Sequence, residues 1–154
     1  MAFSGRYQRE INLLKSSAHG LVTPVAQLQR QLRDTLTSAT NYFTRQTSIT
    51  ASADSYDLRG SLEDELGDAV AFDKVHLIHF KNTSTVAAGA DMIFGSAANT
   101  IPLFNATTAG MIIPPQASFT YHNEAGLSTT AGTGDLVYIS GATGDGYELI
   151  IARD

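Results

Sequence analysis

Two histidines in the middle of the chain are the first candidates for metal chemistry. His76 and His79 stand three residues apart in the apolar run VHLIHF, which begins at Val75. On a strand, residues three apart point to opposite faces of the sheet, so this spacing does not let the pair share one metal ion. Each is therefore predicted to be a partly buried or hydrogen-bonded histidine, and the sequence predicts neither a metal site nor a cofactor.

An acidic segment precedes this run. Glu63, Asp64, Glu65 and Asp68 carry carboxylate oxygens, the donors that calcium prefers. Their spacing does not match the twelve-residue EF-hand loop, and acidic clusters of this kind are usually solvated. We interpret the segment as a solvent-exposed loop.

The sequence shows no pattern typical of catalysis. The absence of cysteine excludes a thiolate nucleophile, a zinc–thiolate site and a disulfide framework. The glycine-rich stretches 132–134 and 141–146 match neither nucleotide-binding spacing and are predicted to be turns. No nucleophile elbow marks a Ser-His-Asp triad. We therefore predict that the protein is not an enzyme and has no catalytic residues.

The composition and the turn spacing predict an all-β fold. With 43% hydrophobic and 16% charged residues, the chain is too apolar for a disordered protein, and no apolar run is long enough to cross a membrane as a helix. Turn signals recur every eight to twelve residues from about residue 70 onward, which is the spacing of all-β sandwich or barrel proteins. We predict an antiparallel β-sandwich of jelly-roll-like topology, with an immunoglobulin-like strand order as the alternative.

Alternating or apolar runs place the individual strands. The final two runs, separated by GATGDG, form the clearest predicted hairpin. One turn is predicted to begin at Asn82, and another is predicted at 38–41. The predicted strands are 7–13, 42–50, 55–58, 70–81, 92–94, 101–104, 111–113, 117–122, 136–140 and 147–152.

Residues 23–37 fit either a helix or a strand. Thr23 and Pro24 resemble an N-cap followed by proline at the first helical position. The apolar residues that follow fall at helical spacing: Val25, Leu28, Leu32 and Leu36. The three leucines would also share one face of a strand, but the periodicity alone favours a helix. We therefore divide the chain into an extended or partly helical N-terminal arm with the first strands, residues 1–40, and a β-sandwich body, residues 41–154, within one compact domain overall.

Charge is unevenly distributed along the chain. Residues 1–49 carry six basic and two acidic residues, a net of +4, and residues 50–154 carry four basic and 13 acidic residues, a net of -9; together these give -5. A basic leading segment suggests contact with an acidic protein surface, another copy of the chain or nucleic acid, although a solubilising role is the alternative. Nucleic acid is the weakest option, because the basic residues are sparse and no recognition motif accompanies them. The first ten residues lack the apolar region of a secretory signal.

Several stretches of the chain resemble a group of small β-sandwich virion proteins of tailed bacteriophages. The residues that carry the resemblance are SYDLRGSLEDELGDAVAFDKVHLIHFKNTS at 55–84, IIPPQASF at 112–119, AGTGDL at 131–136 and the ending YELIIARD. The resemblance covers roughly residues 40–154, and it favours a strand over a helix at 23–37. It implies a capsid- or tail-associated structural role, most simply a decoration (cement) protein that binds the major capsid protein outside the capsid lattice.

Four residues near the N-terminus are the candidates for that contact: Phe3, Arg6, Tyr7 and Arg9. Aromatic residues and arginine dominate the energetics of many interfaces, although Phe3 and Tyr7 could instead cover the protein's own core. We expect a homo-oligomer, with a trimer favoured, on the capsid surface of a virion assembled in the host cytoplasm and without a membrane partner. The alternatives are a tail, adaptor or fibre component, and a carbohydrate-binding β-sandwich for host attachment; the absence of tryptophan limits the last.

Overall fold

The computed structural model describes residues 3–16, 25–39, 41–60, 62–63, 69–85, 90–104 and 109–153. Every regular element within these ranges is a β-strand, which confirms the all-β prediction. In the described part of the chain no helix is long and apolar enough to cross a membrane. The chain divides into two compact units, Met1–Ala39 and Thr40–Asp154, and each is described by itself.

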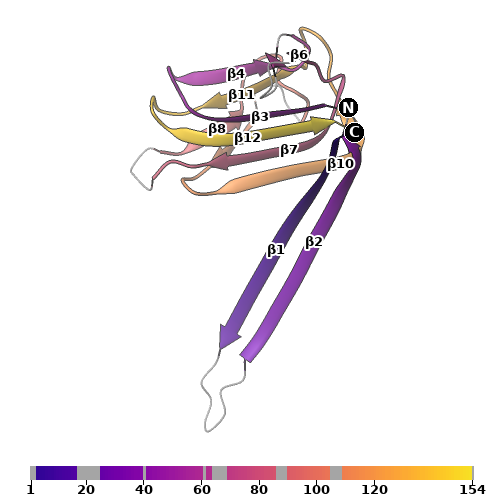
Figure 1. The fold of residues 1–154 in the computed structure, drawn as a ribbon. Coiled ribbons are helices and arrows are strands. Elements are labelled where there is room, and N and C mark those ends of the chain that lie inside the picture. The colour runs from indigo at the N-terminus through magenta and orange to yellow at the C-terminus, as the bar shows by residue number, and fades with distance from the viewer. Residues whose placement is uncertain are drawn as a thin grey trace. The chain divides into compact units, whose positions relative to one another are not determined.

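The first unit is a two-stranded antiparallel ladder. Strand β1 (Phe3–Ser16) pairs with β2 (Val25–Ala39) (Figure 1). The structure therefore answers the question left open at 23–37: residues 25–37 are strand, whereas Thr23 and Pro24 lie outside the described residues. Leucines spaced four apart suit both structures, and the hydrogen-bonding groups of β1 decide between them. The turn predicted at 38–41 is wrong at its start, because β2 continues to Ala39.

The second unit contains two four-stranded antiparallel sheets (Figure 1). The first sheet has the order β10-β7-β12-β3, and the second has the order β4-β11-β8-β9. A short ladder of β5 (Leu62–Glu63) and β6 (Ala69–Val70) accompanies them. The strands of the first sheet are β3 (Asn41–Ser48), β7 (Lys74–Asn82), β10 (Ser118–Ser128) and β12 (Gly146–Arg153). Those of the second are β4 (Ala53–Asp57), β8 (Met92–Gly95), β9 (Gly110–Ile113) and β11 (Leu136–Ser140).

Side chains from both sheets form a single hydrophobic cluster. On β7 and β12 the alternating residues Ile78 with Ile151, and Phe80 with Leu149, are direct cross-strand partners and are fully buried. Phe80 meets Phe94 of the second sheet, with ring centroids 5.4 Å apart. The two-residue period of these strands therefore gives each sheet an apolar face that the other sheet covers.

The predicted final hairpin is wrong. Strands β11 and β12 follow one another in the chain, but β11 lies in the second sheet and β12 in the first. The glycine-rich segment 141–145 thus carries the chain from one sheet to the other, and Asp145 accepts a hydrogen bond from the Ala142 N–H within it, at 2.9 Å. Glycine-rich segments and alternating strands occur both in hairpins and in crossovers between sheets, so these signals could not separate the two.

Two other predicted strands are corrected. The chain turns at Ile101 to Phe104 instead of forming a strand, and the buried Ile101 donates its N–H to the Leu136 carbonyl at 2.9 Å. The strand predicted at 70–81 is interrupted before Lys74. There Phe72 is fully buried and donates its N–H to the Leu58 carbonyl, at 2.7 Å. In both places a buried apolar residue is fixed by isolated hydrogen bonds to its backbone and not by a strand ladder.

Asn82 joins the two sheets through its side chain. It is the last residue of β7 and is fully buried. Its Nδ2 donates to the Ala90 carbonyl at 2.8 Å and to the Ile113 carbonyl of β9 at 3.0 Å, and its Oδ1 accepts from the Ser84 N–H at 3.0 Å. The bond from the Ser84 N–H to the Asn82 side chain is typical of the turn predicted to begin at Asn82. The same side-chain amide also links β7 to the end of β9.

Candidate functional site

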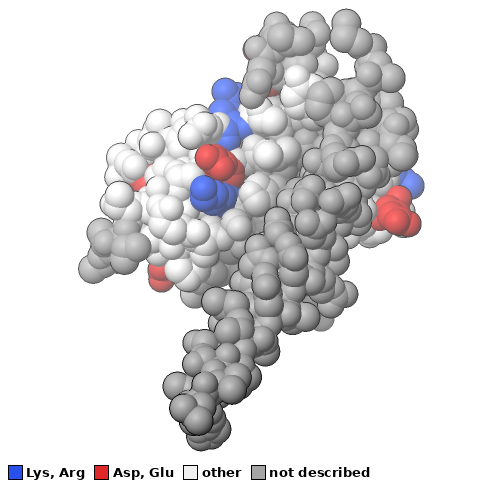
Figure 2. All heavy atoms as spheres, turned by 60° about the horizontal axis from the view of Figure 1, so that its bottom comes forward, with Lys and Arg blue, Asp and Glu red and all other residues white. Residues whose placement is uncertain are grey.

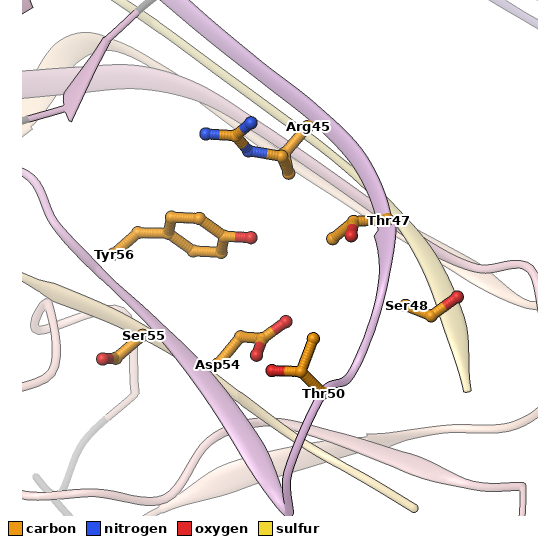
Figure 3. Close-up of a pocket in the computed structure, with 7 residues that line it drawn as sticks. All are labelled: Arg45, Thr47, Ser48, Thr50, Asp54, Ser55 and Tyr56. Carbon is orange, nitrogen blue, oxygen red and sulfur yellow. The ribbon is translucent and has the colours of Figure 1, made fainter. Parts of the chain in front are cut away.

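A polar cleft of about 300 Å³ lies between β3 and β4. Each of these strands is the outermost strand at one edge of its sheet. Figure 3 shows Tyr56 and Arg45 projecting toward one another across the cleft, with Asp54 and Thr50 at its other end. The lining residues are Arg45, Thr47, Ser48, Thr50, Asp54, Ser55 and Tyr56.

The strand register explains why polar side chains enter the space between the sheets. On β3, Arg45 pairs with Leu149 and Thr47 with Tyr147, both of which are buried on the core side of β12. Directly paired residues share a face, so Arg45 and Thr47 point toward the core side at the sheet edge. The same holds on β4, where Asp54 pairs with the buried Ile139 of β11. Inward-pointing charges at outer strands also protect sheet edges from pairing with other chains.

A chain of hydrogen bonds runs from this cleft toward the core. The Tyr147 hydroxyl donates to Asp54 Oδ2 at 2.6 Å. The hydroxyls of Tyr56 and Tyr147 are also hydrogen-bonded to each other. Because Tyr147 gives its proton to Asp54, Tyr56 is the donor in that second bond. The Tyr147 ring, stacked on Phe80 with centroids 5.9 Å apart, fixes the position of this network.

Both tyrosines are held in their neutral forms. Burial raises the pKa of Tyr56, and the Asp54 carboxylate adds to that rise, whereas the hydrogen bond with Tyr147 and the nearby Arg45 guanidinium lower it in part. Burial, followed by the hydrogen bond to Asp54, raises the pKa of Tyr147 far above its usual value. At neutral pH the hydroxyls therefore act as donors and the only charges of the network are those of Asp54 and Arg45.

Arg45 is exposed and lies against aromatic residues. Its guanidinium carbon stands 5.4 Å from the centroid of the Phe43 ring, within the range of a cation–π contact. Phe43 in turn packs against Tyr56, with centroids 5.2 Å apart. The arginine is thus held over the cleft by an aromatic contact, while the residue as a whole stays exposed.

The histidines and the acidic loop gather no metal ligands in the described part of the chain, where no group of three or more His, Cys, Asp or Glu residues could hold an ion. His76 is buried, and the Nδ1 of the half-buried His79 is hydrogen-bonded to Thr120 Oγ1 at 2.8 Å. Both therefore match the expected partly buried histidines. Asp64, Glu65 and Asp68 lie outside the described residues.

The four residues predicted to make contacts all fall on β1. In the ladder Phe3 pairs with Ala39, Arg6 with Thr35, Tyr7 with Asp34 and Arg9 with Leu32. They belong to the first unit and the cleft belongs to the second, so the structure offers two separate candidate sites.

The cleft was missed in the sequence, although a weak signal was present. Arg45 and Thr47 stand two residues apart in the predicted strand 42–50, so they share a face. Asp54 and Tyr56 are also two apart, and Asp54 directly precedes the predicted strand 55–58. Only the pairing partners show that this face is the core side.

Charged side chains are sparse on the described surface, and Figure 2 shows small red and blue groups on a mostly uncharged face. Arg153 and Asp73 form an ion pair, and their closest atoms are 2.5 Å apart. No family model, curated protein or solved structure matches this chain. A function must therefore be argued from its own residues.

Proposed function

We propose that this protein is a bacteriophage virion structural protein, most simply a capsid decoration (cement) subunit that binds the major capsid protein through strands β1 and β2. The observation that carries the proposal is the long β1–β2 ladder, which forms a unit of its own. An isolated two-stranded ribbon is at best marginally stable in water and needs packing against another surface. A capsid lattice would supply that surface.

The charge of the two units supports the same contact. Unit Met1–Ala39 has five basic and two acidic residues, a net of +3, whereas unit Thr40–Asp154 has five basic and 13 acidic residues, a net of -8. An acidic partner would attract the basic β1–β2 ladder and repel the acidic second unit. The ladder would therefore make the first contact with such a partner. Phe3, Arg6, Tyr7 and Arg9 are the residues we assign to this contact.

The strand order supports a jelly-roll sandwich for the second unit. Leaving aside the short β5–β6 ladder, one sheet contains the first, third, sixth and eighth strands and the other contains the second, fourth, fifth and seventh. We infer from this order two Greek keys closed on one another, an architecture found in viral capsid and lectin domains. The comparison is one of fold and does not by itself carry a function.

A decoration role also suits a homo-oligomer, for which we propose a trimer. Many copies on a symmetric shell make individually weak contacts effective, since each further contact is intramolecular. A tail or adaptor position would use the same ribbon with a different partner.

The proposal is tested by binding of the full-length protein to purified capsids that lack it. We expect the wild type to co-sediment with capsids and the combined substitution Phe3→Ala, Arg6→Ala, Tyr7→Ala and Arg9→Ala to abolish binding, with the thermal midpoint of the second unit unchanged. Arg59→Ala, at an exposed position of the second unit, is the control. Capsid binding that survives the fourfold substitution would overturn the assignment. Labelling confined to tails in electron micrographs would replace the capsid role by the tail role.

A further inference from the structure

We propose that the cleft between β3 and β4 binds a neutral saccharide. The inference goes beyond capsid decoration, because it assigns a ligand to a part of the second unit that the decoration contact does not use. It rests on the charge balance of the cleft, on its supply of hydrogen-bonding groups and on its rigid attachment to two strands.

The charge balance of the cleft disfavours a ligand with a net positive or negative charge. Arg45 contributes one positive charge and Asp54 one negative charge, and no other residue that lines the cleft is charged at neutral pH. An anion attracted by Arg45 would be repelled by Asp54, and a cation would meet the reverse. A neutral polar molecule avoids both penalties.

The hydrogen-bonding groups match hydroxyls in particular. Asp54 is an acceptor only and Arg45 a donor only, whereas Thr47 and Thr50 can do both. Asp54 Oδ2 accepts from Tyr147, and within the described part of the chain no hydrogen bond engages Asp54 Oδ1 or the hydroxyls of Thr47 and Thr50. A vicinal diol can donate to a carboxylate and accept from a guanidinium at once, whereas a ketone or carboxylate only accepts and an ammonium group only donates.

The cleft also has an apolar component and a fixed shape. Tyr56 is half-buried, braced by Phe43 and hydrogen-bonded to Tyr147, so its ring and hydroxyl keep their place. An aromatic ring next to a cluster of polar groups provides both faces that a sugar ring presents, the C–H face and the hydroxyl edge. Because the groups lie on paired strands, little ordering is needed on binding.

The size of the cleft sets the affinity that we expect. A volume of about 300 Å³ lies at the lower end of small-molecule sites, so it suits one or two sugar rings. We expect a Kd of about 1 mM for a single site, and multivalent display would raise the effective affinity.

The experiment is a titration of the full-length protein, observed by amide NMR, with glucose, galactose, N-acetylglucosamine, rhamnose and maltotriose, each up to about 50 mM, well above the expected Kd. We expect at least one of these sugars to shift amides of β3 and β4 near the cleft and to leave β8 and β9 unchanged. Arg45→Gln and Thr47→Val should each weaken that binding, Arg45→Gln about tenfold because it removes a charge-assisted bond. Gln46→Ala, on the opposite face of β3, is the matched control and should bind normally.

The same spectra report whether each variant is folded, so loss of binding is separable from loss of structure. Absence of shifts with all five sugars would overturn the proposal, as would shifts that Arg45→Gln and Thr47→Val leave unchanged. Tighter binding of inorganic phosphate or glucose 6-phosphate than of glucose would also overturn it, in favour of an anion site. Because no capsid is present, the result is independent of the decoration role.

Discussion

Replacing Asn82 by alanine should destabilise the second unit more than any other single amide change described here. The side chain is fully buried and makes three hydrogen bonds, two to carbonyls and one to an N–H. All three partners are backbone groups of buried residues, Ala90, Ile113 and Ser84. Alanine removes every one of these bonds and supplies no replacement.

The magnitude follows from the groups left without partners. A buried polar group that loses its hydrogen bond costs about 1–3 kcal/mol, and each carbonyl keeps a second lone pair for other contacts. For three groups we expect a loss of about 3–5 kcal/mol, a large part of the roughly 5–15 kcal/mol that stabilises a typical domain. In a domain of this size the thermal midpoint should fall by about 10–20 °C.

Equilibrium urea unfolding, followed by tyrosine fluorescence and circular dichroism, measures the loss directly. The matched control is Asn123→Ala, which removes a bond to the Tyr121 hydroxyl and one from the Ala125 N–H, each at 2.9 Å, at a half-buried position. Water can replace both partners there, so we expect a loss of about 1 kcal/mol or less. A loss below about 1 kcal/mol for Asn82→Ala, with an unchanged denaturant slope, would refute the reasoning.

Two further predictions concern the tyrosine network and the irregular part of β10. The pKa values of Tyr56 and Tyr147 are raised in the folded protein, so their contribution to stability is complete below about pH 10 and is lost as the pH rises above it. In Tyr147→Phe the urea midpoint should therefore fall less steeply between about pH 9 and 11 than in the wild type. An unchanged dependence of the midpoint on pH would contradict this. Gly126 has φ +72°, and a Cβ there would lie 2.7 Å from Nε2 of the buried His76, so Gly126→Ala should cost about 2–3 kcal/mol in urea unfolding. Gly132, with φ +74° and nothing within 4 Å of the added Cβ, isolates the backbone part, and Gly132→Ala should cost about 1 kcal/mol; equal losses at the two positions would show that the contact with His76 does not matter.

Much of the strand content could be predicted, because a two-residue period leaves a clear trace in the sequence. Ile78 and Phe80, and likewise Leu149 and Ile151, alternate with polar or partly exposed residues and form the shared core. The pairing of strands could not be predicted in the same way. Alternation shows that a strand has an apolar face, but it does not say in which of two sheets that face lies.

The final two strands illustrate this limit. Local turn chemistry favours a hairpin between β11 and β12. In the structure β11 pairs with β4 and β8, and β12 pairs with β3 and β7. These partners lie far away in the sequence, so the segment between the two strands carries no signal of them.

The cleft was beyond sequence analysis for a related reason. Arg45 and Asp54 appear as ordinary surface charges until their partners Leu149 and Ile139 show that they point toward the core side. The bridging role of Asn82 was likewise invisible, because its two carbonyl partners are distant in the sequence or lie beyond the turn it begins. Side chains that act between strands leave no periodic signal.

The position of β12 has a consequence for the order of events during synthesis. This strand lies between β7 and β3 and pairs with both, yet it is translated after every other strand of its sheet. On a ribosome that adds about 5–20 residues per second, β3 waits several seconds for its neighbour, with its apolar face available to chaperones. The β1–β2 ladder needs only residues 3–39 and can pair long before that moment. All residues of the region proposed to dock on the capsid are therefore synthesised while the rest of the chain is still being made.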